Sequence, residues 1–399
     1  MRICLVSQEY PPETARGGLG TQTQAKARGL SGLGHEVVVV SAAKGGVRTE
    51  QQSGGITVIR IPGFHPRMAI HTEAAAWLTY SAEVAAEVWR LHRQRPLDLV
   101  DFAEWGGEGY LHVLNQTAWN HIPTTVQIHG PLVMFAETMG WPERDSEIYR
   151  VGRMMEETSL RLADAVYSSS RHSAKWCATH YGLDEDRIEV LHTGVDTEMF
   201  QPGLAPKEER PTVLFVGRLE RQKGVDVLFE AACAVSAEVP GLRLRFAGGD
   251  SSGLAPELES QARERGMGDL VEFKGYIPHS ELPSEFNRAH VMAAPSVAEG
   301  GPGFVYLEAM ACGLPVVGCR EGGASETIAD GETGVLVEQR SVAGLAAALR
   351  RLLRNPAQAA AMGAKAREHV RMNFDSGKCL AALEAFYLEV AGAVRPGAR

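Results

Sequence analysis

The chain has 399 residues, of which 44% are hydrophobic and 22% charged, a composition typical of a soluble globular protein. A chain of this length predicts about two domains, because a single hydrophobic core rarely grows so large. The net charge of −9 argues against a general nucleic-acid-binding protein, whose surface would be basic.

No apolar run approaches the roughly 18–20 residues that a membrane-spanning helix needs. The N-terminal stretch 1–7 has an apolar core too short for a signal peptide and predicts a strand. The six cysteines form no C-x-x-C pair, and the 13 histidines show no metal-binding spacing. We therefore expect a cytoplasmic protein with free thiols, no metal site and no cofactor. Peripheral contact with a membrane is compatible with this sequence.

Short apolar runs alternate with helical periodicity along the whole chain, which predicts an α/β fold with parallel sheets. In the first half, strands are expected at residues 2–7, 37–41, 57–61, 97–102, 124–129, 165–169 and 188–191, with helices at 21–32, 74–94 and 146–162. In the second half, strands are expected at 212–216, 242–247, 271–275, 291–294, 315–318 and 334–337. The order of elements in each half predicts a doubly wound, Rossmann-like sheet. Ligands of such sheets bind beyond the carboxyl ends of the strands. Two such domains facing across a cleft would hold the ligand between them.

The segment 201–211 is rich in proline, glycine and charge, and we interpret it as the linker between the halves. We place the first domain at residues 1–200 and the second at 201–374. The last segment is apolar at helical spacing and could cap the second domain or cross back to the first. We expect the helix of residues 375–399 to join the first domain.

A glycine run, Gly17-Gly18-Leu19-Gly20, follows the first strand and precedes a helix. It could form a tight turn that approaches a phosphate, or a plain connection. The run lacks the G-x-G-x-x-G spacing, and no acidic residue ends the second strand. Both features argue against dinucleotide binding, and hence against a dehydrogenase.

Two cations follow the strand at 212–216. The strand ends in Gly217, which is followed by Arg218 and then by Lys223 just before a helix. An arginine fork and a lysine point charge near a helix N-terminus suit a diphosphate. A solvated charged loop is the alternative interpretation.

Two glutamates, Glu299 and Glu308, bracket a glycine- and proline-rich turn between a strand and a short helix. Such a turn can direct backbone N–H groups and a helix N-terminus toward an anion. The carboxylates beside it could accept hydrogen bonds from hydroxyl groups. An anion flanked by hydroxyl groups describes a nucleotide-sugar, with its diphosphate, ribose and sugar.

His129 ends a first-half strand before a Gly-Pro turn, where a structural and a ligand-facing role are both open. Glu104 and Trp105 follow the neighbouring strand and point to the same edge. Phe135 and Trp141 belong to an apolar loop cluster of a kind that more often packs than contacts substrate.

In this order the motifs resemble those of the retaining glycosyltransferases of family 4, which have the GT-B fold of two Rossmann-like domains. The resemblance covers nearly the whole chain and rests on Gly17-Gly18-x-Gly20, His129-Gly130, Gly194-Val195-Asp196, Val216-Gly217-Arg218 with Lys223-Gly224, and Glu299 with Glu308-Ala309-Met310.

The resemblance implies a role for each charged residue. Arg218 and Lys223 would hold the donor diphosphate and stabilise the leaving nucleotide. Glu308 would accept hydrogen bonds from the ribose, and Glu299 would contact the transferred sugar. Such enzymes need no metal. The other implied donor contacts are Gly18, Gly301, Gly303 and Phe304 at the phosphates and sugar, Tyr276 and Ile277 at the base, and His129 at the sugar near its reacting side.

Two departures from the family pattern stand out. Its glutamates are usually separated by seven residues, whereas eight, Gly300 to Leu307, lie between them here. A bulge could absorb the extra residue, or Glu299 could move away from the sugar. Thr193 also stands where the family often has asparagine.

The resemblance implies a hexosyl- or N-acetylhexosaminyltransferase that retains the anomeric configuration. On family frequency the donor is a UDP-sugar first and a GDP-sugar second. The hydroxyl acceptor could be a glycan, a small metabolite or a lipid-linked sugar, bound by loops of the first domain. A nucleotide-sugar epimerase of the same fold and a catalytically silent nucleotide-sugar binder are the alternatives.

Overall fold

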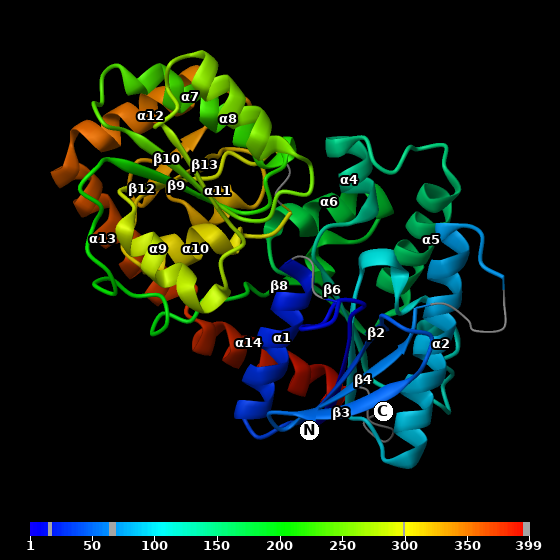
Figure 1. Ribbon diagram of the computed structural model, residues 1–399. Coiled ribbons are helices and arrows are strands. Elements are labelled where there is room, and N and C mark those ends of the chain that lie inside the picture. Colours follow the sequence, from blue (N-terminus) through cyan, green and yellow to red (C-terminus); the bar gives the residue numbers. More distant parts are fainter. Residues whose placement is uncertain (15–17, 64–68, 298–299, 394–399) are drawn as a thin grey trace. The chain divides into compact units, whose positions relative to one another are not determined.

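The computed structural model describes residues 1–14, 18–63, 69–297 and 300–393. The chain forms two compact units, Met1–Thr193 with Leu380–Arg399, and Gly194–Cys379 (Figure 1). Each unit is built around one sheet with helices on both faces, so the predicted α/β class with two mainly parallel sheets is confirmed. None of the helices in the described part of the chain is long and apolar enough to cross a membrane.

The first unit contains an eight-stranded sheet of order β3-β4-β2-β1-β5-β6-β7-β8. All neighbours are parallel except β3 and β4. The strands are β1 Arg2–Val6, β2 Glu36–Ala43, β3 Thr49–Ser53, β4 Ile56–Pro62, β5 Leu99–Ala103, β6 Thr124–Ile128, β7 Ala165–Ser168 and β8 Ile188–Val190. The helices are α1 Gly18–Gly32, α2 Glu73–Gln94, η1 Trp105–Gly107, α3 Tyr110–Leu114, α4 Leu132–Met139, α5 Glu147–Leu162, α6 Arg171–Tyr181 and η2 Glu185–Arg187.

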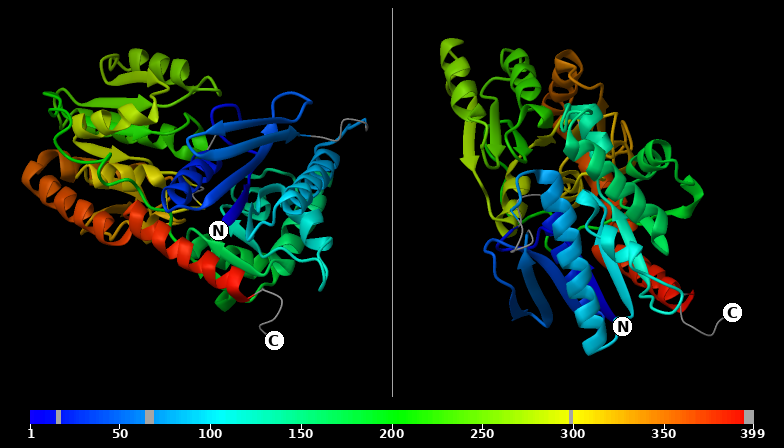
Figure 2. Two further views of the ribbon diagram at one scale, coloured as in Figure 1. Left: turned by 90° about the horizontal axis from the view of Figure 1, so that it is seen from below. Right: turned by 90° about the vertical axis from the view of Figure 1, so that its right-hand side faces the viewer.

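The valine-rich strands of this sheet are buried on both faces, as expected of a parallel sheet between helix layers. Helices α2, α5 and α6 contribute to the hydrophobic cluster on one face. On the other face, α1 and the helix α14, Ser376–Ala393, belong to one hydrophobic cluster with β1 and β2. Figure 2 shows α14 in red beside the blue strands of this unit.

The second unit contains six parallel strands in the order β11-β10-β9-β12-β13-β14. They are β9 Thr212–Val216, β10 Arg243–Ala247, β11 Val271–Gly275, β12 Val291–Ala293, β13 Val316–Cys319 and β14 Gly334–Val337. Helices α7 Val225–Ser236, α8 Leu254–Glu264 and α12 Val342–Arg354 cover one face (Figure 1). The other elements are η3 Arg221–Lys223, η4 His279–Glu281, α9 Leu282–Arg288, α10 Phe304–Ala311, α11 Ala324–Thr327 and α13 Pro356–Asn373.

The strand orders define where each sheet can bind a ligand. In the first unit β1 lies between β2 and β5, and in the second β9 lies between β10 and β12. From each of these central strands the chain continues to one side of the sheet first and to the other side later. The carboxyl ends of β1 and β9 are therefore topological switch points. Ligands of doubly wound sheets bind beyond the carboxyl ends at such a point.

The segment 201–211, which we expected to be the linker, lies within the second unit and is hydrogen-bonded to it. The backbone N–H of Gly203 donates to Asn287 (2.7 Å), and that of Glu208 donates to the carbonyl of Arg288 (3.0 Å). The unit begins at Gly194 rather than at residue 201, because Val195 pairs with Asp375 and Phe200 lies in the second core.

The helix expected at 375–399 begins at Ser376, and the boundary between the units falls inside it, at Cys379/Leu380. Its later turns contribute Leu383, Tyr387 and Val390 to the core of the first unit. The antiparallel edge strand β3 was not predicted from the sequence.

A buried polar network connects α14 to the sheet of the first unit. The Tyr167 hydroxyl lies 3.0 Å from that of Tyr387 and donates to Asp101 (3.1 Å). The Lys26 ammonium group donates to Asp101 (2.6 Å), Gln127 (2.6 Å) and Tyr167 (2.8 Å). Each polar atom of this group therefore finds a partner away from water, which burial requires.

Tyr387→Phe is expected to destabilise the first unit by about 1 kcal/mol, because it removes one buried hydrogen bond and leaves Tyr167 its other partners. Urea unfolding monitored by circular dichroism measures the change. Leu388→Ala, on the exposed side of the same helix, is the control. Equal stability of Tyr387→Phe and the wild type would contradict a stabilising role for the network.

Candidate active site

Arg218 and Lys223 both lie at the carboxyl end of β9. The Arg218 side chain is 57% exposed, and its Nη1 is 2.7 Å from Oε1 of Glu220. Lys223 ends the 3₁₀ turn η3, and the following Gly224 has a φ of 73°. A Cβ on Gly224 would lie 2.2 Å from the carbonyl oxygen of Pro295, so only glycine allows this turn to approach the end of β12. The two cations are thus placed at the switch point between β9 and β12.

The loop after β12 is attached to the turn that carries Lys223. The N–H of Val297 donates to the carbonyl of Gln222 at 2.9 Å. Glu299 lies outside the described residues. Beyond it, the carbonyl of Pro302 accepts a hydrogen bond from Thr327 (3.1 Å), and Gly303, with a φ of 70°, leads into α10 at Phe304.

On the other side of β9, the ends of β9, β10 and β11 are connected through the backbones of glycines. The N–H of Gly217 donates to the carbonyl of Ala247 (2.9 Å), and the N–H of Gly248 donates to that of Gly275 (2.8 Å). A Cβ on Gly248 would lie 1.8 Å from the Gly217 oxygen. Tyr276, 78% exposed, and the half-buried Ile277 follow Gly275 and so lie at the same edge as Arg218.

Glu308 is buried in α10 and bonded to a histidine that sequence reasoning missed. Its Oε1 is 2.7 Å from Nε2 of His279, which opens η4 after β11. Burial raises the pKa of Glu308, and the hydrogen bond from His279 partly offsets this effect. The same hydrogen bond raises the pKa of His279, against partial burial. Its position shortly after a strand was an available signal, the same one that singled out His129.

In the first unit, His129 is held by a buried carboxylate at the carboxyl ends of β5 and β6. Glu104 accepts hydrogen bonds from the backbone N–H groups of His129 (2.7 Å) and Gly130 (2.5 Å) through Oε1. Its Oε2 is 3.1 Å from Nδ1 of His129. Nδ1–H donation to this carboxylate would leave Nε2 as the acceptor on the neutral ring. Gly18 lies in the same unit, as the exposed first residue of α1.

Two further buried glutamates bind loop backbone in this region. Glu108 accepts a hydrogen bond from the N–H of Gln8 (2.9 Å), and Glu156 accepts from Gly106 (3.2 Å) and Leu132 (3.0 Å). Burial raises the pKa of each carboxyl group to about 8. No three His, Cys, Asp or Glu side chains of the described residues are arranged to hold a metal ion. These carboxyl groups therefore organise loops.

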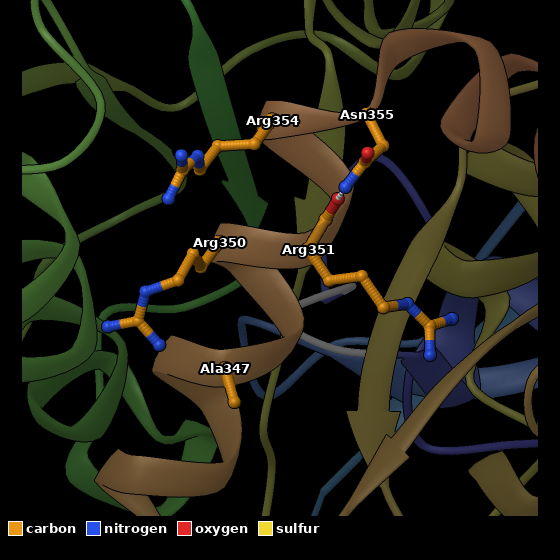
Figure 3. A pocket seen from close by; sticks show the side chains of 5 residues that line it. All are labelled: Ala347, Arg350, Arg351, Arg354 and Asn355. Carbon is orange, nitrogen blue, oxygen red and sulfur yellow. Dashed lines mark hydrogen bonds between the residues drawn. The ribbon is translucent and has the colours of Figure 1, made fainter.

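A cationic pocket of about 510 Å³ on α12 lies apart from the candidate site (Figure 3). Arg350 and Arg354 pair with Glu238, at 2.8 and 3.5 Å, whereas Arg351 points away from them. Glu238 follows the C-terminal end of α7. Because helices that follow parallel strands run back along the sheet, this pocket lies at the amino edge, opposite Arg218.

Comparison with known proteins gives matches along the whole chain. The family model "Glycosyltransferase Family 4" matches residues 16–199, and "Glycosyl transferases group 1" matches residues 196–369. The GDP-mannose-dependent alpha-(1-6)-phosphatidylinositol monomannoside mannosyltransferase of Mycolicibacterium smegmatis is 30% identical, over 92% of this chain and 92% of its own length.

Two solved structures share the fold. Sucrose-phosphate synthase from Thermosynechococcus elongatus superimposes with a TM-score of 0.81 at 24% identity, covering 98% of this chain and 99% of the other. HepE of Anabaena, in complex with UDP and glucose, superimposes with a TM-score of 0.74 at 19% identity, covering 98% and 100%. Identities this low establish the architecture of both units and nothing about their ligands.

The His279–Glu308 pair is expected to titrate as a unit. In the wild type, the His279 pKa measured by NMR will lie above the usual value of about 6.5, and Glu308→Gln will return it toward that value. Stability from the protonated histidine is present below the usual pKa and lost as pH rises through the raised one. His290 is the control, since burial lowers its pKa without Glu308. An unchanged His279 titration in Glu308→Gln would refute the pairing.

Glu104→Ala is expected to destabilise the first unit by at least about 1–3 kcal/mol, because the Gly130 N–H would be left buried without an acceptor. Glu104→Gln keeps one oxygen acceptor and should cost less. Thermal unfolding measures both, with Glu143→Ala as an exposed control in the same unit. A Glu104→Ala variant as stable as the control would show that Glu104 does not hold the loop.

Proposed function

Because the chain belongs to the family 4 glycosyltransferases and has their GT-B fold, we propose that it transfers a sugar from a nucleoside diphosphate sugar to a hydroxyl group with retention of configuration. The observation that carries the proposal is that Arg218 and Lys223 lie at the same switch point, between β9 and β12, as the glycine-rich loop that precedes α10. We call this loop, Gly300 to Gly303, the glycine loop. A diphosphate is the ligand that this combination suits.

The proposed donor is a UDP-sugar first and a GDP-sugar second. HepE, of the same fold, holds UDP and glucose, whereas the M. smegmatis relative is named for GDP-mannose. Tyr276 and Ile277 are proposed to contact the base. Glu308, held by His279, is proposed to accept hydrogen bonds from the ribose.

The proposed reaction breaks the bond between the anomeric carbon and the diphosphate oxygen and forms one to the acceptor oxygen on the same face. The acceptor's proton passes to the departing phosphate. Arg218, Lys223 and the N–H groups of Gly301 to Phe304 stabilise the charge that grows on the diphosphate. Glu299 and His129 are proposed to bind the transferred sugar, and Gly18 to approach the phosphate. The transferred sugar is a hexose or an N-acetylhexosamine.

Arg218→Ala and Lys223→Ala are each expected to lower kcat by about 10²–10³, because each removes a preorganised donor to the leaving group. Nucleotide release from UDP-glucose and GDP-mannose is measured with and without a mixture of methyl glycosides and cyclitols as acceptors. Release that the acceptor accelerates distinguishes a transferase from a silent binder.

Arg351→Ala removes an exposed arginine of the same unit, at the opposite edge of the sheet, and should leave kcat unchanged. Full turnover in Arg218→Ala and Lys223→Ala would overturn the diphosphate assignment. Product NMR determines the anomeric configuration, and an inverted product would overturn the proposal of retention.

A further inference from the structure

Four aromatic rings of the first unit form a continuous cluster, three of them in segments after β5 and β6 and one in α2. Trp105 is its centre, with ring centroids 5.9 Å from Trp77, 5.2 Å from Phe135 and 6.2 Å from Trp141. Trp77 and Phe135 meet Trp105 edge-on, whereas Trp141 is stacked on it at an interplanar angle of 27°. We call these four residues the aromatic cluster.

The aromatic cluster packs on Gly130, the residue after His129. A Cβ on Gly130 would lie 3.2 Å from the Phe135 ring, so this ring packs on the residue that follows His129. Glu104, which binds the His129 backbone and Nδ1, directly precedes Trp105 in the chain. The carboxylate that orients the imidazole thus also fixes the start of the segment that carries the central indole.

Exposure increases along the aromatic cluster from its inner to its outer end. Trp77 is only 8% exposed, Trp105 and Phe135 are half-buried, and Trp141 is 44% exposed. The Trp77 end is therefore part of the hydrophobic core. The Trp141 end leaves a large apolar surface in water, which a ligand with a matching apolar face could cover.

From this arrangement we infer that the aromatic cluster is an acceptor subsite for an uncharged ring polyol, a pyranoside or a cyclitol; the inference rests on the proposed transferase function. Such a ring presents C–H groups on its face and hydroxyl groups at its rim. The face can stack on the exposed ring of Trp141, while the rim needs polar partners. Nε2 of His129, which has no hydrogen-bond partner among the described residues, is the partner we assign, because Phe135 packs on the residue that follows it.

Other classes of acceptor fit less well. An alkyl chain would cover the indoles but leave the imidazole without a partner. A phosphorylated ring would need a cation, and Arg144, close to Trp141 in the chain, is already paired with Glu137 at 2.8 Å. Stacked rings restrict the orientation of a planar ligand, so the aromatic cluster would select ring acceptors over linear polyols.

The test compares acceptor kinetics of Trp141→Leu, which keeps apolar volume but loses the ring, with Trp141→Phe, which keeps a ring. The probes are methyl α-D-glucopyranoside and myo-inositol, with glycerol and sorbitol as linear polyols, and the donor is UDP-glucose or GDP-mannose, whichever is turned over. Trp119→Leu is the matched control, because Trp119 is 97% exposed in the same unit and outside the aromatic cluster.

We expect Trp141→Leu to raise the KM for the ring polyols by about 3- to 10-fold, the size of one lost aromatic contact, with kcat within about twofold of wild type. In Trp141→Phe the KM for the ring polyols should return most of the way to the wild-type value. The KM for the linear polyols, and every KM of Trp119→Leu, should be unchanged. Trp105→Leu should act in the same direction.

Donor hydrolysis without acceptor separates the two proposals. If hydrolysis is normal while Trp141→Leu leaves the KM for ring polyols unchanged, or raises it equally for linear polyols, the aromatic cluster is not the subsite. The same conclusion follows if the wild type shows neither transfer to a ring polyol nor its binding by saturation-transfer NMR. If the donor is neither hydrolysed nor transferred, the proposed function itself has failed.

Discussion

Close approach of backbone to backbone is the constraint on which the second unit depends. Gly224 reaches the carbonyl of Pro295 and Gly248 that of Gly217, at distances where a Cβ would lie about 2 Å from an oxygen. These contacts bring the ends of β9, β10 and β12 together, so that Arg218 and Lys223 leave the sheet beside the glycine loop. Charged groups whose positions are fixed before a reaction are the ones that stabilise developing charge most strongly.

The first unit fixes its loops by different means. Here buried carboxyl groups accept hydrogen bonds from backbone N–H groups that are distant in the sequence. Glu104 accepts from His129 and Gly130. Glu156 accepts from Gly106 and Leu132. The raised pKa of Glu156 reflects its burial. Since a carboxyl oxygen can serve two donors, one side chain can orient two loops at once. This arrangement uses none of the side chains of the aromatic cluster, of which Trp141 remains 44% exposed.

The sequence predicted the framework better than the details of the site. Buried strands such as β9 and β14 match their predicted bounds because their apolar runs are bounded by glycine or polar residues. The edge strand β3 is exposed at all five positions, so it has no apolar alternation to detect. Proline and charge at 201–211 indicated a linker, but the segment's contacts with α9 come from distant residues and are invisible locally. The histidine at 279 follows a predicted strand, but its pairing could not be predicted locally, because its partner Glu308 is 29 residues away.

The carboxyl edges of the two sheets also differ in how much they can contribute to the choice of acceptor. Proteins named for mannosyl transfer and for sucrose phosphate synthesis are similar to this chain, so the glycine-bound edge of the second unit cannot by itself specify an acceptor. That choice must come from side chains that the architecture does not need. Trp141 meets this condition, because its ring is almost half exposed and contributes to neither the sheet nor its covering helices. Glu104 does not meet this condition, because without it the backbone N–H of Gly130 would lose its acceptor. If the aromatic cluster binds the acceptor as proposed, selectivity in the first unit therefore depends on its exposed end, while Glu104 fixes the backbone at His129 and Gly130.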